Sequence, residues 1–152
     1  MYHNLNEQPF KQSKKYIPKI PTDIIKEISK YLNIQTLIKL SQVSKLFKSG
    51  VKIINFTKID SEIIKMTDEI LQLSIFNDLQ SLYARNNKLI TDQGIKNLKL
   101  IKLNASENPN ITDQGIKNLK LIKLDSSHNS NITNIGIKNF NLRIQTLLMY
   151  HG

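Results

Sequence analysis

The sequence predicts an α/β solenoid that begins with a short helical hairpin and continues as an array of repeats with parallel strands. A block of 21 residues is written almost verbatim twice, as Ile90–Asn110 and Ile111–Asn131. A third, diverging copy begins at Ile132. Self-similarity at a fixed period of about 20 to 50 residues marks stacked repeats, in which each unit covers the apolar face of its neighbour. Such arrays usually present a surface to a partner.

The bulk composition limits the classes of protein to which the chain can belong. A length of 152 residues suits one domain, or a small module joined to a short array. The chain has no cysteine, which excludes disulfides and thiolate metal sites. No apolar run approaches the roughly 18–20 residues that span a bilayer, and the first residues lack the apolar core of a signal peptide. We therefore expect a cytoplasmic or nuclear protein.

The formal net charge of +10 raises the question of nucleic-acid binding. Only Arg85 and Arg143 carry the guanidinium fork that phosphate and guanine readers favour, and the other 20 basic residues are lysines. The chain also holds 24 isoleucines and 17 asparagines, which share A/T-rich codons with lysine. An A/T-rich protist genome, or that of a large DNA virus acting in such a host cell, explains the lysines without a ligand. Nucleic acid is therefore not an expected partner.

A helical module is predicted at residues 17–50, after a polar and disordered segment at residues 1–16. Pro21 can open its first helix, and Thr22 or Asp23 can cap that helix. After a break at 33–35, a second helix is predicted over about 36–48, with Gly50 as its stop. Apolar residues at helical spacing are Ile24, Ile25, Ile28, Tyr31 and Leu32 in the first helix, and Leu37, Ile38, Leu40, Val43, Leu46 and Phe47 in the second.

Residues 51–152 carry a repeated pattern, Leu-x-x-Leu-x-Leu-x-x-Asn, which is the form of a leucine-rich repeat. Its copies start near residues 51, 79, 100, 121 and 144, which predicts about four or five strands. Inward Leu103 and Ala105 alternate with outward Lys102 and Asn104, as a strand with one buried face requires. At the turn that follows, the side-chain amide of Asn108 can satisfy backbone groups of the adjacent unit.

A coiled coil is the rival interpretation, because 21 residues are three heptads. Pro109 in one block, and a glycine in each block at Gly94, Gly115 and Gly136, argue against a continuous helix. The Thr-Asp pair that precedes the first two of these glycines can instead cap a short helix. Stacked repeats are therefore the prediction.

The segment Ile20–Phe47 resembles an F-box. That motif has an aliphatic residue and proline at its start, a Tyr-Leu pair, a break, and a second aliphatic helix that ends in Val-Cys/Ser-Lys and an aromatic residue. Ile20 replaces the common leucine here, and Phe47 replaces the common tryptophan. The matching positions are Ile20-Pro21, Ile24, Ile25, Ile28, Tyr31-Leu32, Leu37, Leu40, Val43-Ser44-Lys45 and Phe47.

The repeats resemble the cysteine-containing subclass of leucine-rich repeats. The Ile-Thr-Asp-x-Gly signature of that subclass recurs at Ile90–Ile95 and Ile111–Ile116, with Asn108 and Asn129 in place of the turn cysteine. An F-box followed by such repeats implies a substrate-recognition adaptor of a cullin-type ubiquitin ligase. In that family the F-box docks to a Skp-type adaptor on the cullin scaffold and the repeats hold the target protein. The resemblance thus implies a non-catalytic subunit without a cofactor.

The resemblance places adaptor binding on the apolar residues of the two predicted helices. The alternative is that several of these side chains, especially Ile25, Leu37 and Val43, pack internally against the first repeat. The adaptor-binding residues that we predict are Ile20, Pro21, Ile24, Ile28, Leu32, Leu40 and Phe47.

Target contacts are expected on the outward face of the strands. Tyr83, Arg85 and Tyr150 are of the types that most often anchor interfaces. Lys102 and Lys123 add a basic stripe, which suggests an acidic partner. The alternative is that this charged face only keeps the array soluble. The target-binding residues that we predict are Tyr83, Arg85, Lys102, Asn104, Lys123, Asp125 and Tyr150.

Catalytic motifs give no competing prediction. His3, His128 and His151 show no metal-ligand spacing, and the sequence has neither a P-loop nor a serine elbow. The second functional hypothesis is therefore another binding protein. It would be a stand-alone leucine-rich-repeat scaffold whose two helices only cap the array, without a link to a ubiquitin ligase.

Overall fold

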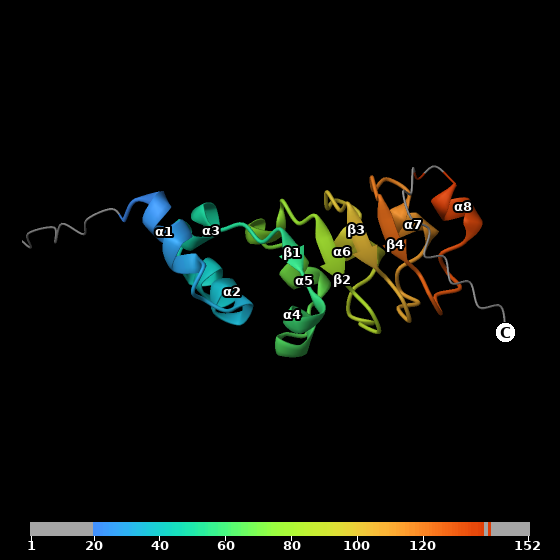
Figure 1. Ribbon diagram of the computed structural model, residues 1–152, viewed down its shortest axis with the longest axis horizontal. Helices are drawn as coiled ribbons and strands as arrows, with labels where there is room; N and C mark the ends of the chain where they lie inside the picture. The colour runs from blue at the N-terminus through green and yellow to red at the C-terminus, as the bar shows by residue number, and fades with distance from the viewer. Residues whose placement is uncertain (1–19, 139, 141–152) are drawn as a thin grey trace, which may run out of the picture.

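The computed structural model describes residues 20–138 and residue 140 of the chain. The molecule is elongated, with three helices at one end, a parallel sheet through the middle and a short helix at the other end (Figure 1). In the part of the chain so described, every helix is too short or too polar to cross a membrane. The predicted segment 1–16 and the strand predicted near residue 144 lie outside the described residues.

The N-terminal helices are α1 (Thr22–Ser29), α2 (Ile34–Val43) and α3 (Lys45–Gly50). Pro21 itself occupies the N-cap position of α1, and no side chain caps this helix. The prediction that Thr22 or Asp23 caps the helix is therefore wrong. Proline has a fixed φ that leads the chain into a helix, so α1 begins one residue earlier than a polar cap would allow.

The second predicted helix is two helices, separated at Ser44. The backbone of Ser44 is extended (φ −126°, ψ 118°), so it ends α2 and begins α3. Asn33 starts α2, because its side chain accepts a hydrogen bond of 2.9 Å from the backbone N–H of Thr36. Gly50 closes α3, as predicted.

The sheet contains β1 (Asn55–Phe56), β2 (Ser81–Tyr83), β3 (Lys102–Asn104) and β4 (Lys123–Asp125), in that order and all parallel. Phe56, Leu82, Leu103 and Leu124 lie side by side across it. The burial of Leu103 and Ala105 confirms their predicted inward orientation. A helical N-terminal region joined to a four-stranded parallel sheet is consistent with the predicted α/β class.

We call each strand, with the chain up to the next strand, a coil. The first coil contains α4 (Lys58–Ile63), α5 (Asp68–Leu71) and the 3₁₀ helix η1 (Ser74–Phe76). The next three contain α6 (Asp92–Ile95), α7 (Asp113–Ile116) and α8 (Asn134–Ile137). The helices α5 to α8 lie beside one another in the order of the strands. One continuous apolar core runs from Ile25 in α1 to Ile132 in the fourth coil.

Asparagine side chains join neighbouring coils at the turns after β2, β3 and β4. The amide of Asn108 donates to the carbonyl oxygens of Ala84, Asn87 and Ile90, at 3.3, 2.8 and 3.1 Å. Asn129 repeats these three bonds one coil further along. Both side chains are buried, so each bond satisfies a backbone group that water does not reach.

Threonine and aspartate join the same coils on the helix side. The backbone N–H and the hydroxyl of Thr112 both donate to the carboxylate of Asp92 in the preceding coil, each at 2.7 Å. Thr91 binds Asp68 and Thr133 binds Asp113 in the same way. Each threonine oxygen also accepts from the first turn of its own helix, so one hydroxyl caps a helix and links two coils.

The glycines of the repeats lie inside the short helices and do not interrupt them. A β-carbon at Gly115 would lie 2.8 Å from the Cγ atom of Asp92, and Gly94 and Gly136 face the preceding aspartate in the same way. None of these glycines has a positive φ. The glycine is therefore required by the space that the aspartate of the previous coil occupies. The repeats are short helices and not the continuous helix of a coiled coil, as predicted, although the glycines do not interrupt these helices.

Candidate docking surfaces

Helix α1 has an apolar face that no other part of residues 20–138 and 140 covers. Ile24 and Ile28 lie four residues apart and so share one side of the helix, and Ile20 precedes them in the chain, just before Pro21 at the helix start. Their exposed fractions are 46%, 49% and 43%, whereas the neighbouring Ile25 is 2% exposed. Helix α1 thus presents one apolar side to the core of this chain and a second to solvent. Exposed apolar side chains that are grouped in this way are typical of an interaction surface.

The other predicted adaptor-binding residues are divided between solvent and core. Pro21 is exposed, while Leu32 and Leu40 are half-buried. Phe47 is also half-buried, because it packs against the core of this chain. Leu32, Leu40 and Phe47 are therefore only partly open to a partner.

Ile25, Leu37 and Val43 were the residues expected to pack internally rather than to bind the adaptor, and two of these three do so. Ile25 is buried and Leu37 packs against the core, but Val43 is 83% exposed. Val43 is the last residue of α2, where the break at Ser44 turns the chain away from the helix. Tyr31, at 85% exposure, and Leu46 enlarge the exposed apolar surface, and neither was among the predicted contacts. The Tyr-Leu pair of the F-box motif was the sequence signal that could have placed Tyr31 among the predicted adaptor-binding residues.

Comparison with known families places this surface in a recognised domain. Residues 17–59 match the F-box domain. No curated protein matches the chain. The match supports an F-box protein, and F-box domains bind a Skp-type adaptor within a cullin complex. F-box proteins are typically non-catalytic adaptors of ubiquitin ligases, which suggests this role for the chain.

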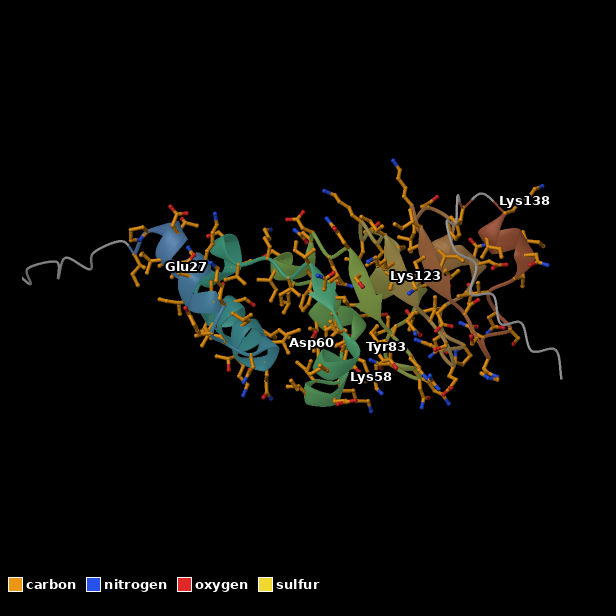
Figure 2. The ribbon with its side chains drawn as sticks, viewed as in Figure 1. Glu27, Lys58, Asp60, Tyr83, Lys123 and Lys138 are labelled. Carbon is orange, nitrogen blue, oxygen red and sulfur yellow. The ribbon has the colours of Figure 1, made fainter. Side chains whose placement is uncertain are left out.

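The outward face of the sheet carries two rows of polar side chains. Ser81, Lys102 and Lys123 are register partners in the first row, and Tyr83, Asn104 and Asp125 are partners in the second. A shallow groove of about 220 Å³ is lined by Ser81, Lys102, Leu103, Asn104, Lys123 and Asp125. Four of the predicted target-binding residues therefore lie together around one groove, and Figure 2 shows Lys123 and Tyr83 over the sheet. Tyr150 lies outside the described residues.

Several polar side chains of this face are bound to one another. The amide of Asn104 donates to Asp125 at 2.9 Å, and Ser106 donates to Asn104 through its hydroxyl at 2.6 Å. Ser106 is 2% exposed, so it lies behind this face rather than on it. Arg85 forms an ion pair of 2.6 Å with Glu107. Asn104 and Asp125 of the second row are thus bound to one another, and Arg85 is already engaged by Glu107.

Carboxylates and lysines of the coils differ in their partners. Asp92, Asp113 and Asp125 accept hydrogen bonds from neighbouring coils. In contrast, none of the ion pairs found in residues 20–138 and 140 involves Lys102 or Lys123, both of which are exposed. The strand face therefore offers free positive charge, as a surface for an acidic partner requires.

On α5, a hydrogen bond from the Thr67 side chain holds the pKa of the Glu69 carboxyl below its ordinary value. Within the described ranges, no group of three or more His, Cys, Asp or Glu side chains is placed to hold a metal ion.

Proposed function

We propose that this protein is the substrate-recognition adaptor of a cullin-type ubiquitin ligase, whose F-box docks to a Skp-type adaptor while the coils bind the target. The observation that carries the proposal is the uncovered apolar face of Ile20, Ile24 and Ile28 on helices that match the F-box domain. Burial of apolar surface contributes about 25 cal/mol per Å², so such a face favours a partner that covers it.

The four coils are interpreted as a leucine-rich-repeat solenoid of the cysteine-containing type. This interpretation is supported by the 21-residue period, the parallel register and the amide bonds that Asn108 and Asn129 make to the preceding coil. In this interpretation the strand face around Lys102 and Lys123 binds an acidic region of the target protein. The free lysines on that face support this choice of partner.

The proposed mechanism is proximity and requires no chemistry from this chain. An adaptor tied to the F-box places the coils near the charged ubiquitin-conjugating enzyme, and the coils hold the target there. Tethering raises the local concentration of the target's lysines, which accelerates transfer without a new catalytic group. Such a protein would act in the cytoplasm or nucleus, or in those compartments of a host cell if its source is viral.

The proposal is tested by co-purification of the full chain with a Skp-type adaptor. The double substitution Ile24→Glu/Ile28→Glu is expected to abolish retention of the adaptor, because two charges would then enter an apolar interface. The matched control is Ile135→Glu, which places the same substitution at an isoleucine of α8 that is 81% exposed. Failure of the unaltered chain to retain the adaptor, or equal retention by the double variant, would remove the proposed ligase role.

A further inference from the structure

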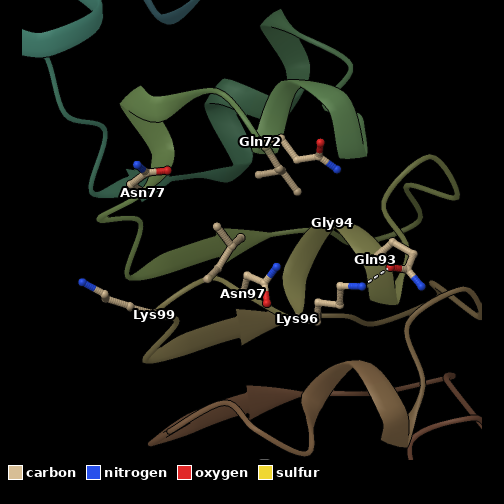
Figure 3. A pocket seen from close by; sticks show the side chains of 9 residues that line it. Gln72, Asn77, Gln93, Gly94, Lys96, Asn97 and Lys99 are labelled. Carbon is tan, nitrogen blue, oxygen red and sulfur yellow. Dashed lines mark hydrogen bonds between the residues drawn. The ribbon is translucent and has the colours of Figure 1, made fainter.

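A second groove lies between the first and second coils, away from the strand face. It has a volume of about 590 Å³ and is open to solvent along one side. Figure 3 shows Gln72 and Asn77 on one wall, with Lys96, Asn97 and Lys99 on the opposite wall. No residue of β2, β3 or β4 lines this groove. It is therefore a site distinct from the proposed target surface.

A difference in chain length accounts for the groove. Three more residues separate Asp68 from Leu82 than separate Asp92 from Leu103, although the four residues hold equivalent places in their coils. The helix η1 lies within this longer segment. As a result, Leu98 in the groove remains half-buried, whereas its equivalent Leu119 in the next coil is 5% exposed. The two nearly identical sequence blocks thus have different surroundings.

The chemistry of the lining points to a peptide. Four carboxamides, from Gln72, Asn77, Gln93 and Asn97, line the groove, and each can donate to a carbonyl and accept from an N–H group. Leu71 and Leu98 supply an apolar patch among them. Small-molecule sites are mostly enclosed and apolar, which this open polar groove is not. It also has no aromatic residue and no arginine, which stacking and phosphate contacts to nucleic acid would use.

The charge of the groove determines which peptide it suits. Lys96 and Lys99 are its only charged lining residues, and both are exposed. The ammonium group of Lys96 donates to the side chain of Gln93. Across the described part of the chain, neither lysine takes part in an ion pair. The unpaired positive charge calls for carboxylates on the ligand.

We infer that this groove binds an extended acidic peptide segment, with an apolar side chain over Leu71 and Leu98 and flanking carboxylates at Lys96 and Lys99. The carboxamides on the two walls form hydrogen bonds to the peptide backbone. The site adds a second contact region to the protein, on the helix side of the coils. It does not depend on the proposed ligase role, since neither the F-box nor the strand face contributes to it.

The test measures fluorescence anisotropy of a fluorescein-labelled Glu-Asp-Leu-Asp-Glu peptide with the full chain. The substitution Lys96→Glu/Lys99→Glu is expected to weaken binding about tenfold, equivalent to about 1.4 kcal/mol. The duplication supplies a matched control, because Lys117→Glu/Lys120→Glu makes the same changes in the same local sequence outside the groove. This control is expected to change the affinity less than about twofold, since exposed charges outside a site contribute little.

A second measurement guards against a general effect of charge. On addition of the peptide, the side-chain amide signals of Gln93 and Asn97 should shift in an NMR spectrum, while those of Gln114 and Asn118 should not. A neutral Gln-Asn-Leu-Asn-Gln peptide should bind much more weakly than the acidic one. Any of three results would overturn the inference. The two lysine variants could lose affinity equally, a thymidine oligonucleotide could displace the peptide equally from both variants, or the amide signals could stay unmoved.

Discussion

The N-terminal helices and the repeated coils are held together by different interactions. The side chains of residues 20–50 that form hydrogen bonds reach residues no more than four positions away. One longer bond reaches these helices from outside, where the hydroxyl of Ser74 donates to the carbonyl oxygen of Lys48. In the coils, the side chain of Asn108 reaches residues 18 to 24 positions away. The helices therefore depend on apolar packing, whereas the coils are joined by directed polar bonds.

This difference explains why the two regions have different surfaces. Apolar packing leaves the helices with an apolar face, at Ile24 and Ile28, that nothing else in the described part of the chain covers. The strands of the coils turn Leu82, Leu103 and Leu124 inward, so their outward face is polar and carries Lys102 and Lys123, although single apolar residues such as Ile135 are exposed elsewhere on the coils. The first region is suited to a permanent apolar contact, and the second to recognition by charge and hydrogen bonding.

The largest expected effect is in the asparagine bonds between coils. Asn108→Ala removes three hydrogen bonds to carbonyl groups in a site that water does not reach, and should lower the free energy of unfolding by on the order of 4 kcal/mol. The exposed Asn118→Ala is the control and should change it by less than about 0.5 kcal/mol. Urea unfolding measures both variants. Similar values for the two would mean that the coils, like the helices, are held by apolar packing alone.

The next effect contrasts the two sides of α1. Ile25→Ala creates a cavity in the core and should lower the free energy of unfolding by about 3 kcal/mol. Ile24→Ala, one residue earlier, removes a half-exposed side chain and should lower it by less than about 1 kcal/mol. The same unfolding measurement on the isolated chain decides the point. A comparable loss from Ile24→Ala would show that the apolar face is covered in solution.

The smallest of the three effects compares glycines from the two regions. Gly115→Ala pushes against the carboxylate of Asp92 and should lower the free energy of unfolding by about 2 kcal/mol. Gly50→Ala in α3 would place its β-carbon 3.3 Å from the side chain of Ile25, a contact that a small shift relieves. We expect a change within about 0.5 kcal/mol there, because alanine favours the helix. A larger loss at Gly50 than at Gly115 would contradict the packing described for the coils.

The sequence predicted the features that depend on periodicity. Alternation in the strands placed Leu103 and Ala105 inward, and the four-residue spacing in α1 grouped Ile24 with Ile28. The prediction of one continuous second helix failed at Ser44, because the apolar pattern continues through Val43 to Leu46 without a glycine or proline to mark the break. Local pattern could not reveal the role of Gly115, which depends on a side chain of the preceding coil.

The groove beside Lys96 and Lys99 could not be predicted for a related reason. Lys117 and Lys120 have the same neighbours in sequence, and only the longer first coil distinguishes the two pairs in space. A motif search treats both blocks alike. The distinction appears only when each coil is compared with the coil that it packs against.

The threonine–aspartate bonds also determine how such a molecule can grow. Each block carries a carboxylate for the block after it and a threonine for the block before it, as Asp92 and Thr112 show. Unequal crossing-over that adds or deletes a whole block therefore keeps both partners of every threonine–aspartate contact, the aspartate of one block and the threonine of the next. The lineage can lengthen its array by copying, without new mutations to make the copy fit. Asn134, which replaces the aspartate in the third copy, lacks the second acceptor oxygen, so a block placed after it would have a weaker contact with it.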